Sequence, residues 1–164
     1  CLRVADGRKK RMVRLADLDE PERSHLGTIP CPDFDTQPWV AGGPLSERRI
    51  AMVSTAALQH RNDNPFLIGT GDYRVIADDT PDKDLVMGHI STNFDRSGFE
   101  QDLNVVLPRD RLHELAEAGE IGSVGKYHYA FMGSTDPMQM EDAARAMAGH
   151  LKADGVDTVF LLPV

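Results

Sequence analysis

The sequence is poor in cysteine and contains no long apolar run. Its only cysteines are Cys1 and Cys31, which excludes a disulfide framework and a cysteine-rich metal site. No apolar stretch approaches the ~20 residues that span a bilayer. The first residues, CLRVADGRKK, lack the apolar centre of a signal peptide. We therefore expect a cytoplasmic protein with no membrane partner.

The chain also lacks an excess of basic residues. It has 26 acidic and 18 basic side chains, a net charge of -8 and a pI of about 5.1. This balance argues against a nucleic-acid or anionic membrane surface. The run RKKR at residues 8–11 is interpreted as a solvated arm, and no nucleic-acid partner is expected.

Common catalytic motifs are missing as well. The sequence contains no G-x-G-x-x-G, Walker loop, H-E-x-x-H or G-x-S-x-G, so it offers no sign of the corresponding nucleotide-binding or hydrolase classes. Neither cysteine has a neighbouring cue for a lowered thiol pKa. The chain therefore shows no evident nucleophile, and no metal-ligand spacing is recognised.

What is present predicts one α/β domain. Its 164 residues are enough for a single core. Residues 1–47 are predicted to form an irregular N-terminal arm with at most a short helix over 15–26, because prolines and glycines interrupt them. Residues 48–164 are predicted to form the α/β domain.

Apolar patterns place the expected elements of that domain. Strands are predicted over 48–55, 73–77, 84–89 and 156–164, with 103–108 as a further short strand or a buried connection, and helices over 108–119 and 136–155. The best helix carries an apolar stripe, formed by Met140, Ala144, Met147 and Leu151. Continuous apolar strands alternating with helices predict a mostly parallel sheet with flanking helices, a three-layer fold like flavodoxin or Rossmann domains.

The first polar cluster closes the first predicted strand. Ser54 and Thr55 follow the apolar run IAMV. In parallel α/β sheets, ligands bind beyond the carboxyl ends of the strands, so this hydroxyl pair is a candidate for ligand contact. The alternative is that the two residues only cap a helix.

The second cluster, residues 88–104, holds many chemical groups directly after a predicted strand. They are His89, Ser91, Thr92, Asn93, Asp95, Arg96, Asp102 and Asn104. His89 is the candidate catalytic acid or base, and the others are candidates for substrate binding. The alternative is a loop whose Ser, Asn and Asp side chains satisfy its own backbone.

The third cluster, residues 125–137, contributes His128, Tyr129 and Gly133 as candidate substrate-binding residues. It leads into the predicted helix near residue 136, whose free N–H groups are a candidate anion site. The alternative is a helix cap together with a Tyr–His pair in the core.

Long stretches of the chain resemble one family. The segment GHISTNFDRSGFEQDLNVVLPRDRLHELAEAGEIGSVGKYHYAFMGSTDP, followed by a helix and DGVDTVFLLPV, resembles the glycine/sarcosine/betaine reductase selenoprotein B family, to which the D-proline reductase subunit is related. The resemblance runs from about Arg48 to Val164. It is also good over VRLADLDEPERSHL and PCPDFDTQPWV, which are similar to the less-studied members of the family.

The resemblance implies that the family's nucleophile is missing from this sequence. In the family, the strand similar to TVFLLPV leads into a selenocysteine with a nearby cysteine, or into Cys-x-x-Cys. We therefore expect a redox motif after Val164, and no cofactor in the chain itself. A UGA codon interpreted as a stop is the favoured explanation for the ending, and a deliberately chosen boundary is the alternative. By itself the chain is expected to be inactive.

The resemblance also implies a function. The full-length family cleaves a C–N bond of a small amine reductively, with a dithiol as electron donor, and works with other reductase subunits and a thioredoxin-like protein. The chain would then be the N-terminal part of such an oxidoreductase. We also expect a homo-oligomer, because a cut sheet leaves an edge and apolar faces exposed. The alternative function is a module that binds a small anion or a metal without catalysis.

Overall fold

The computed structural model describes residues 14–28, 35–37, 39–91 and 96–164. The chain divides into two units, residues 1–37 and 38–164. In the first unit, the predicted short helix is present as η1 (Leu15–Asp17) followed by α1 (Glu20–Thr28), and neither buries a residue. The second unit contains the core and every strand found in the described residues.

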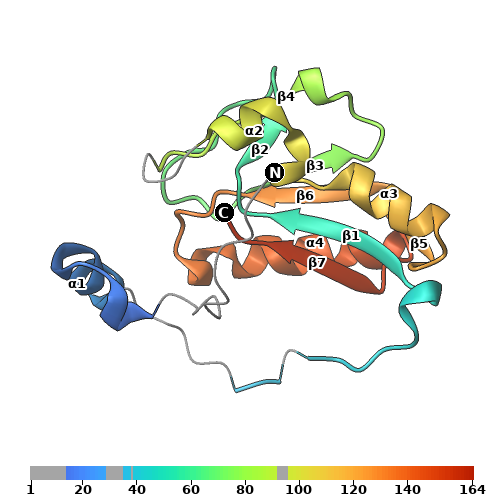
Figure 1. Cartoon of the computed structure of the whole chain (residues 1–164), viewed down its shortest axis with the longest axis horizontal. Helices are drawn as coiled ribbons and strands as arrows, with labels where there is room; N and C mark the ends of the chain where they lie inside the picture. Colours follow the sequence, from blue (N-terminus) through green and yellow to red (C-terminus); the bar gives the residue numbers. More distant parts are fainter. Residues whose placement is uncertain (1–13, 29–34, 38, 92–95) are drawn as a thin grey trace, which may run out of the picture. The chain divides into compact units, whose positions relative to one another are not determined.

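The central strand of the second unit is β1 (Arg49–Ser54), which is buried at every position after Arg49. Strand β7 (Thr158–Leu162) pairs with it in parallel along one edge, and β5 (Ser123–Val124) and β6 (Tyr127–Phe131) pair in parallel with its start and its end. Strand β3 (Tyr73–Ala77) is antiparallel to β6. A strand has only two edges. Since β7 takes one edge of β1, β5 and β6 share the other edge, one after the other. The order across the sheet is therefore β3, β6, β1 and β7, with β5 on the β6 side of β1 (Figure 1).

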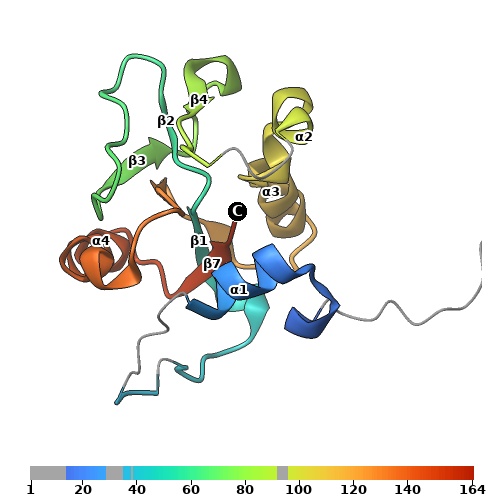
Figure 2. The ribbon, with the colours of Figure 1, turned by 90° about the vertical axis from the view of Figure 1, so that its left-hand side faces the viewer.

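A helix covers each of the two faces of this sheet. Successive residues of β1 point to opposite faces, so β1 packs against both helices. Ile50 and Met52 pack in one core cluster with Leu112 of α3 (Arg109–Glu117). Ala51 and Val53 pack in another with Leu151 of α4 (Glu141–Ala153). Figure 2, which views the sheet from its end, shows α4 on one side and α3 on the other. The predicted α/β fold with a mostly parallel sheet and flanking helices is therefore confirmed.

Some details differ from the sequence predictions, and the strands β5 and β6 were not predicted. A second sheet of two antiparallel strands, β2 (Leu58–His60) and β4 (Leu85–Met87), follows the end of β1; only β4 was predicted. Of the two alternatives for 103–108, the connection is the one present: it begins with the short helix η4 (Leu103–Val105), and Leu103, Val106 and Leu107 are buried. The helix predicted over 136–155 begins as the 3-10 helix η5 (Pro137–Met140) before α4. The other helical turns are η2 (Leu45–Glu47), η3 (Asp82–Asp84) and α2 (Ser97–Gln101).

Substitutions at a buried and an exposed leucine test which residues form the core. Leu58 is 0% exposed and Leu161 is 67% exposed. We expect Leu58→Ala to lower the free energy of unfolding by about 2–5 kcal/mol, because the truncation leaves a cavity. The matched control Leu161→Ala should cost less than about 1 kcal/mol, because its side chain already faces solvent. Urea unfolding measures both, and equal losses would contradict the core assignment.

Candidate functional site

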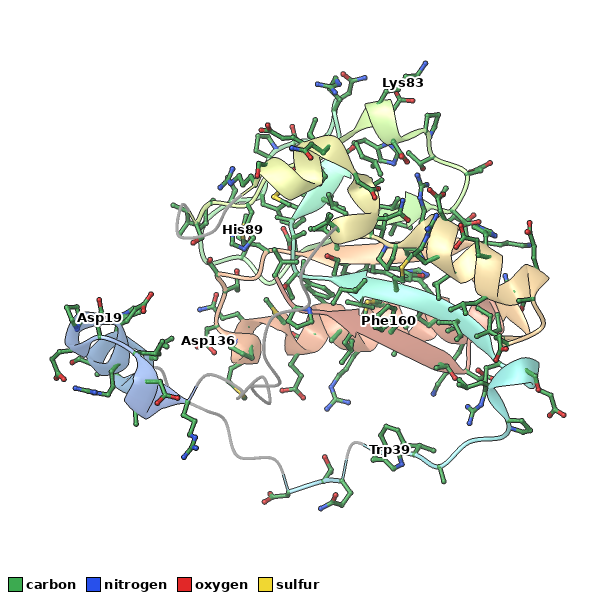
Figure 3. The ribbon with its side chains drawn as sticks, in the orientation of Figure 1. Asp19, Trp39, Lys83, His89, Asp136 and Phe160 are labelled. Carbon is green, nitrogen blue, oxygen red and sulfur yellow. The ribbon has the colours of Figure 1, made fainter. Side chains whose placement is uncertain are left out.

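The topology of the sheet singles out the carboxyl ends of β1 and β6. The chain leaves β1 toward the face covered by α3 and leaves β6 toward the face covered by α4. In α/β sheets, adjacent strands whose connections run to opposite faces leave a crevice at their carboxyl ends, and ligands bind there. Figure 3 shows His89 and Asp136 at this end of the sheet.

Thr55 joins three strands at this end. Its N–H donates to Leu162 O at 3.0 Å, and its carbonyl oxygen accepts from the N–H of Gly133 at 3.0 Å. Its hydroxyl Oγ1 accepts from the N–H of Val164 at 2.8 Å. The ends of β1, β6 and β7 are thereby held together, with the Thr55 hydroxyl between them.

Gly133 allows His89 to approach this junction closely. A Cβ atom on Gly133 would lie 2.9 Å from Thr55 O and 3.1 Å from His89 Nε2. Contacts this short require the neighbouring atoms to move. The structure therefore brings together three of the predicted site residues, Thr55, His89 and Gly133, and a glycine is needed at position 133.

The imidazole of His89 is buried and its orientation is defined. The side chain is 5% exposed, and the N–H of Ser91 donates to Nδ1 at 3.1 Å. A donor on Nδ1 places the ring proton of neutral histidine on Nε2. Burial lowers the pKa of His89 below 6.5, and the positive charge of Arg96 lowers it further. At neutral pH the ring is therefore a neutral imidazole whose Nε2–H lies on the side of Gly133.

Arg96 orders the loop that carries His89. Its Nη2 donates to the carbonyl oxygen of His89 at 2.6 Å and to that of Ser91. A guanidinium with several fixed donors suits such a backbone clamp. This contact gives Arg96 a structural role in the loop, in addition to any contact with a ligand. The predicted site residues Thr92, Asn93 and Asp95 lie outside the described residues.

Ser54 is placed differently from Thr55. It is 0% exposed, and its hydroxyl oxygen accepts from the N–H of Ala56 at 3.2 Å. The side chain therefore supports the turn that ends β1. The predicted hydroxyl pair is split, with only Thr55 directed at the junction of the strands.

Two features at this end of the sheet were not predicted from the sequence. Ala57 has φ 53°, an unusual value for a residue with a Cβ, and its carbonyl oxygen accepts from the N–H of Gly88. Gln59 is 6% exposed, and its Oε1 has no hydrogen-bond partner among the described residues. A strained residue and a buried amide next to the His89 loop are typical of functional sites. Neither residue belongs to a sequence motif, so no local signal marked them.

Asp102 and Asn104 form a capping arrangement. Asp102 Oδ1 accepts from the Asn104 N–H and from Asn104 Nδ2, both at 2.9 Å, and Asn104 Nδ2 also donates to Asp110. The side-chain hydrogen bond from Asn104 holds the pKa of Asp102 below 3.8. These residues cap η4 and the start of α3, as the loop interpretation of this cluster expected.

His128 lies near the opposite end of β6. Its Nδ1 accepts from the N–H of Met52 at 3.1 Å, and Nε2 lies 2.9 Å from Asp78 Oδ1. The other carboxylate oxygen of Asp78 lies 2.8 Å from Nε2 of His113. Burial lowers the pKa of His128, an effect that the Asp78 carboxylate opposes. His128 thus serves a buried polar network and does not join His89.

Tyr129 is a core residue in the structure. It is 1% exposed and packs edge-on against Tyr73, with ring centroids 5.7 Å apart. Burial raises the pKa of its hydroxyl. Its place in the α4 cluster fits the core interpretation of the third polar segment.

The start of the helix near residue 136 is already capped. The Asp136 carboxylate accepts from the N–H of Met138 at 3.0 Å. A carboxylate at this position competes with any external anion for the same N–H groups.

Among the described residues, no three His, Cys, Asp or Glu side chains gather as metal ligands do. Within the same residues, no helix has the length and apolar character needed to cross a bilayer.

The close approach at Gly133 gives a direct test. We expect Gly133→Ala to destabilise the protein by about 1–3 kcal/mol, because the new methyl overpacks against Thr55 and His89. Its His89 ring resonances should also shift. A Cβ on Gly149 in α4 meets nothing within 4 Å, so the control Gly149→Ala should gain about 0.5–1 kcal/mol from helix propensity. Thermal unfolding and NMR measure both variants, and an unperturbed Gly133→Ala protein would contradict the packing.

The two buried histidines predict the dependence of stability on pH. The pKa values of His89 and His128 lie below 6.5 in the folded protein, so below that pH the unfolded chain binds more protons. Their stabilisation is present above pH 6.5 and is lost as the pH falls toward the folded values, by up to about 1.4 kcal/mol per pH unit for each ring.

Urea unfolding at about pH 7.5 and about pH 5.5 checks this slope, because carboxyl groups titrate mostly below that window. The exposed His150 provides the control, and His150→Gln should leave the slope unchanged. Stability that stays constant or rises on acidification would contradict the burial of the two rings as neutral imidazoles.

Comparison with known proteins finds similarity to one family and to two curated proteins. A model of the glycine/sarcosine/betaine reductase selenoprotein B family matches residues 25–163. The chain is 33% identical over 144 residues to the glycine reductase complex component B subunit gamma of Carboxydothermus hydrogenoformans, a match that covers 81% of the chain and 32% of that subunit. It is also 33% identical over 73 residues to the betaine reductase complex component B subunit beta of Peptoclostridium acidaminophilum, covering 44% of the chain and 17% of that subunit.

The chain therefore spans about a third of the length of the first relative and less than a fifth of the second. No solved structure matches it. The family match covers most of the chain, including β1, β6, β7 and the loop that carries His89. This chain belongs to the glycine/sarcosine/betaine reductase selenoprotein B family.

Proposed function

We propose that this chain is the N-terminal, substrate-binding part of a redox-active reductase subunit that cleaves the C–N bond of a small amine. The observation that carries the proposal is the meeting of Thr55, His89 and Gly133 with Val164 at the carboxyl end of the sheet. This is the end where α/β folds bind ligands. The relatives named as glycine reductase and betaine reductase subunits support the reaction class.

His89 is proposed to act as a hydrogen-bond donor to the substrate. The lowered pKa makes its imidazole neutral at pH 7, and the Ser91 N–H on Nδ1 directs the ring proton to Nε2. A neutral, oriented N–H binds the carboxylate of a small amino acid without bringing a second charge into the site. In the acid or base role considered for His89, the lowered pKa keeps the ring in its base form at neutral pH, so the ring would accept a proton rather than donate one.

The proposed reaction needs a nucleophile and an electron donor. A selenolate or thiolate attacks the carbon that bears the amine, a C–Se or C–S bond forms, and the C–N bond breaks as the amine leaves with its electron pair. A dithiol then reduces the new bond to a C–H bond and becomes a disulfide, which returns the nucleophile and supplies the two electrons. We propose that the nucleophile is a selenocysteine or a Cys-x-x-Cys cysteine that follows the strand matching β7 in the full-length family.

The loop after His89 is proposed to select the substrate. Ser91, Thr92, Asn93 and Asp95 supply hydroxyl, amide and carboxylate groups suited to an amine or a carboxylate. Arg96 holds the loop through two backbone carbonyls and is proposed to add positive charge for a substrate carboxylate.

Partners and location follow from the same proposal. The relatives carry the names of subunits of reductase complexes, so we propose that other subunits, and a thioredoxin-like donor, work with this protein in the cytoplasm. Self-association of the isolated chain is also expected, because apolar residues of β7 are exposed. The alternative is a module that binds a small anion or a metal without catalysis; at the helix start, the Asp136 carboxylate already accepts from the N–H of Met138.

Binding measured by NMR tests the proposed site. On titration of the labelled chain with glycine, sarcosine or betaine, we expect shifts at the Thr55 and Gly133 amides and at the His89 ring. His89→Ala should weaken binding at least about tenfold, as expected when a hydrogen bond to a charged group is lost. The control His113→Ala removes a half-exposed ring at the Asp78 end and should leave affinity unchanged.

Either of two results would reject the site. One is binding that is insensitive to His89→Ala. The other is a set of shifts centred on Asp78, His113 and His128. The reductase assignment would then need a different pocket within the same chain.

A further inference from the structure

Strand β7 is an edge strand without the features that protect edge strands. It pairs with β1 along one side, and in the described part of the chain no strand pairs with its other side. Its sequence TVFLL contains no charge and no proline. Natural edge strands usually carry charges, prolines or bulges to prevent pairing with other strands. The free side of β7 is therefore suited to accept another strand.

Both faces of β7 carry apolar residues that are partly exposed, although Leu162 at its end packs against the core. Register pairs Ala51 with Val159, Met52 with Phe160, and Val53 with Leu161. The β1 members of these pairs are at most 7% exposed, whereas Val159, Phe160 and Leu161 are 38%, 43% and 67% exposed. Parallel sheets normally have both faces covered by helices. The cover that protects β1 thus ends before β7.

A groove continues this apolar surface at the start of β7. A cavity of about 540 Å³ is lined by Val159 together with Trp39, Val40 and Leu45, and also by the polar residues Arg48, Asp157 and Thr158. Trp39 and Val40 are 85% and 83% exposed. A strand added beside β7 would bring apolar side chains against these residues, as in other cases of strand addition.

The handedness of the fold specifies where the covering helix would lie. The chain passes from β6 over α4 to β7, and α4 lies on the face of Ala51 and Val53. Crossover connections between parallel strands are almost always right-handed. A connection from β7 to a strand on its free side would continue in the direction from β6 to β7, so its helix would lie on the same face as α4. On that face β7 presents Val159 and Leu161, and Leu161 is its most exposed residue.

We propose that β7 is an interior strand in a polypeptide of the relatives' length. Its occupant is a further parallel strand, reached by a helix that covers Val159 and Leu161 on the α4 face. Both come from the two thirds of the relatives' length that this chain does not span. The inference rests on the proposed function only in treating this chain as part of such a subunit. With this added strand, the junction at Thr55 would lie near the middle of the sheet and not near its edge.

Hydrogen exchange on the glycine reductase component B subunit gamma of Carboxydothermus hydrogenoformans and on the 164-residue chain tests the proposal. In the isolated chain, the β7 amides that face away from β1 are expected to exchange rapidly. In the full-length subunit, the corresponding amides should exchange at least about 100-fold more slowly, because a strand pairs with them. Lysine at the position that matches Leu161 should lower its Tm by several degrees, since that side chain would be buried.

The matched control is lysine at the position of Leu115, which is 41% exposed on α3 and should leave Tm unchanged. Rapid exchange of β7 in the full-length subunit would overturn the proposal. So would protection that disappears on dilution to a monomer, which would assign the edge to a second copy. Neither readout depends on reductase activity, so failure here is distinguishable from failure of the proposed reaction.

Discussion

The structure depends on the pairing of β1 along both edges and its burial on both faces. Its alternating side chains anchor α3 through Ile50 and Met52 and α4 through Ala51 and Val53. Because the flanking strands β6 and β7 run parallel to it, three strand ends meet where β1 stops. Thr55 joins these ends through its backbone and its hydroxyl. The candidate site is thus a consequence of where the most buried strand ends.

The site combines rigidity with a neutral, oriented donor. The His89 loop is held by Arg96 on two carbonyls, and the ring is held by the Ser91 N–H. Gly133 contributes by lacking a side chain, which lets Nε2 approach the strand ends. A neutral imidazole can donate its Nε2–H to an anionic group without bringing a second charge into the site. The Asp78–His128–His113 network at the other end of β6 fastens β3 and α3 to the sheet instead.

Apolar periodicity predicted β1, β3, β4, β7, α3 and α4, because these segments bury a continuous run or one face. It did not predict β2 or β6. LQH is short and polar, and YHYAF contains aromatic and histidine residues that resembled a binding cluster, yet tertiary contacts bury them. The position of His89 after a strand was visible in the sequence. The roles of Gly133 and Gln59 were not, because they arise from contacts between segments far apart in the chain.

The most direct measurement of the central claim is a crystal structure of a full-length relative, the glycine reductase component B subunit gamma, with glycine bound. The account predicts ligand density within hydrogen-bond distance of the residues that match Thr55, His89 and Gly133, at the carboxyl ends of β1 and β6. Density at the amino end of β6, beside the residues that match Asp78 and His128, would contradict it.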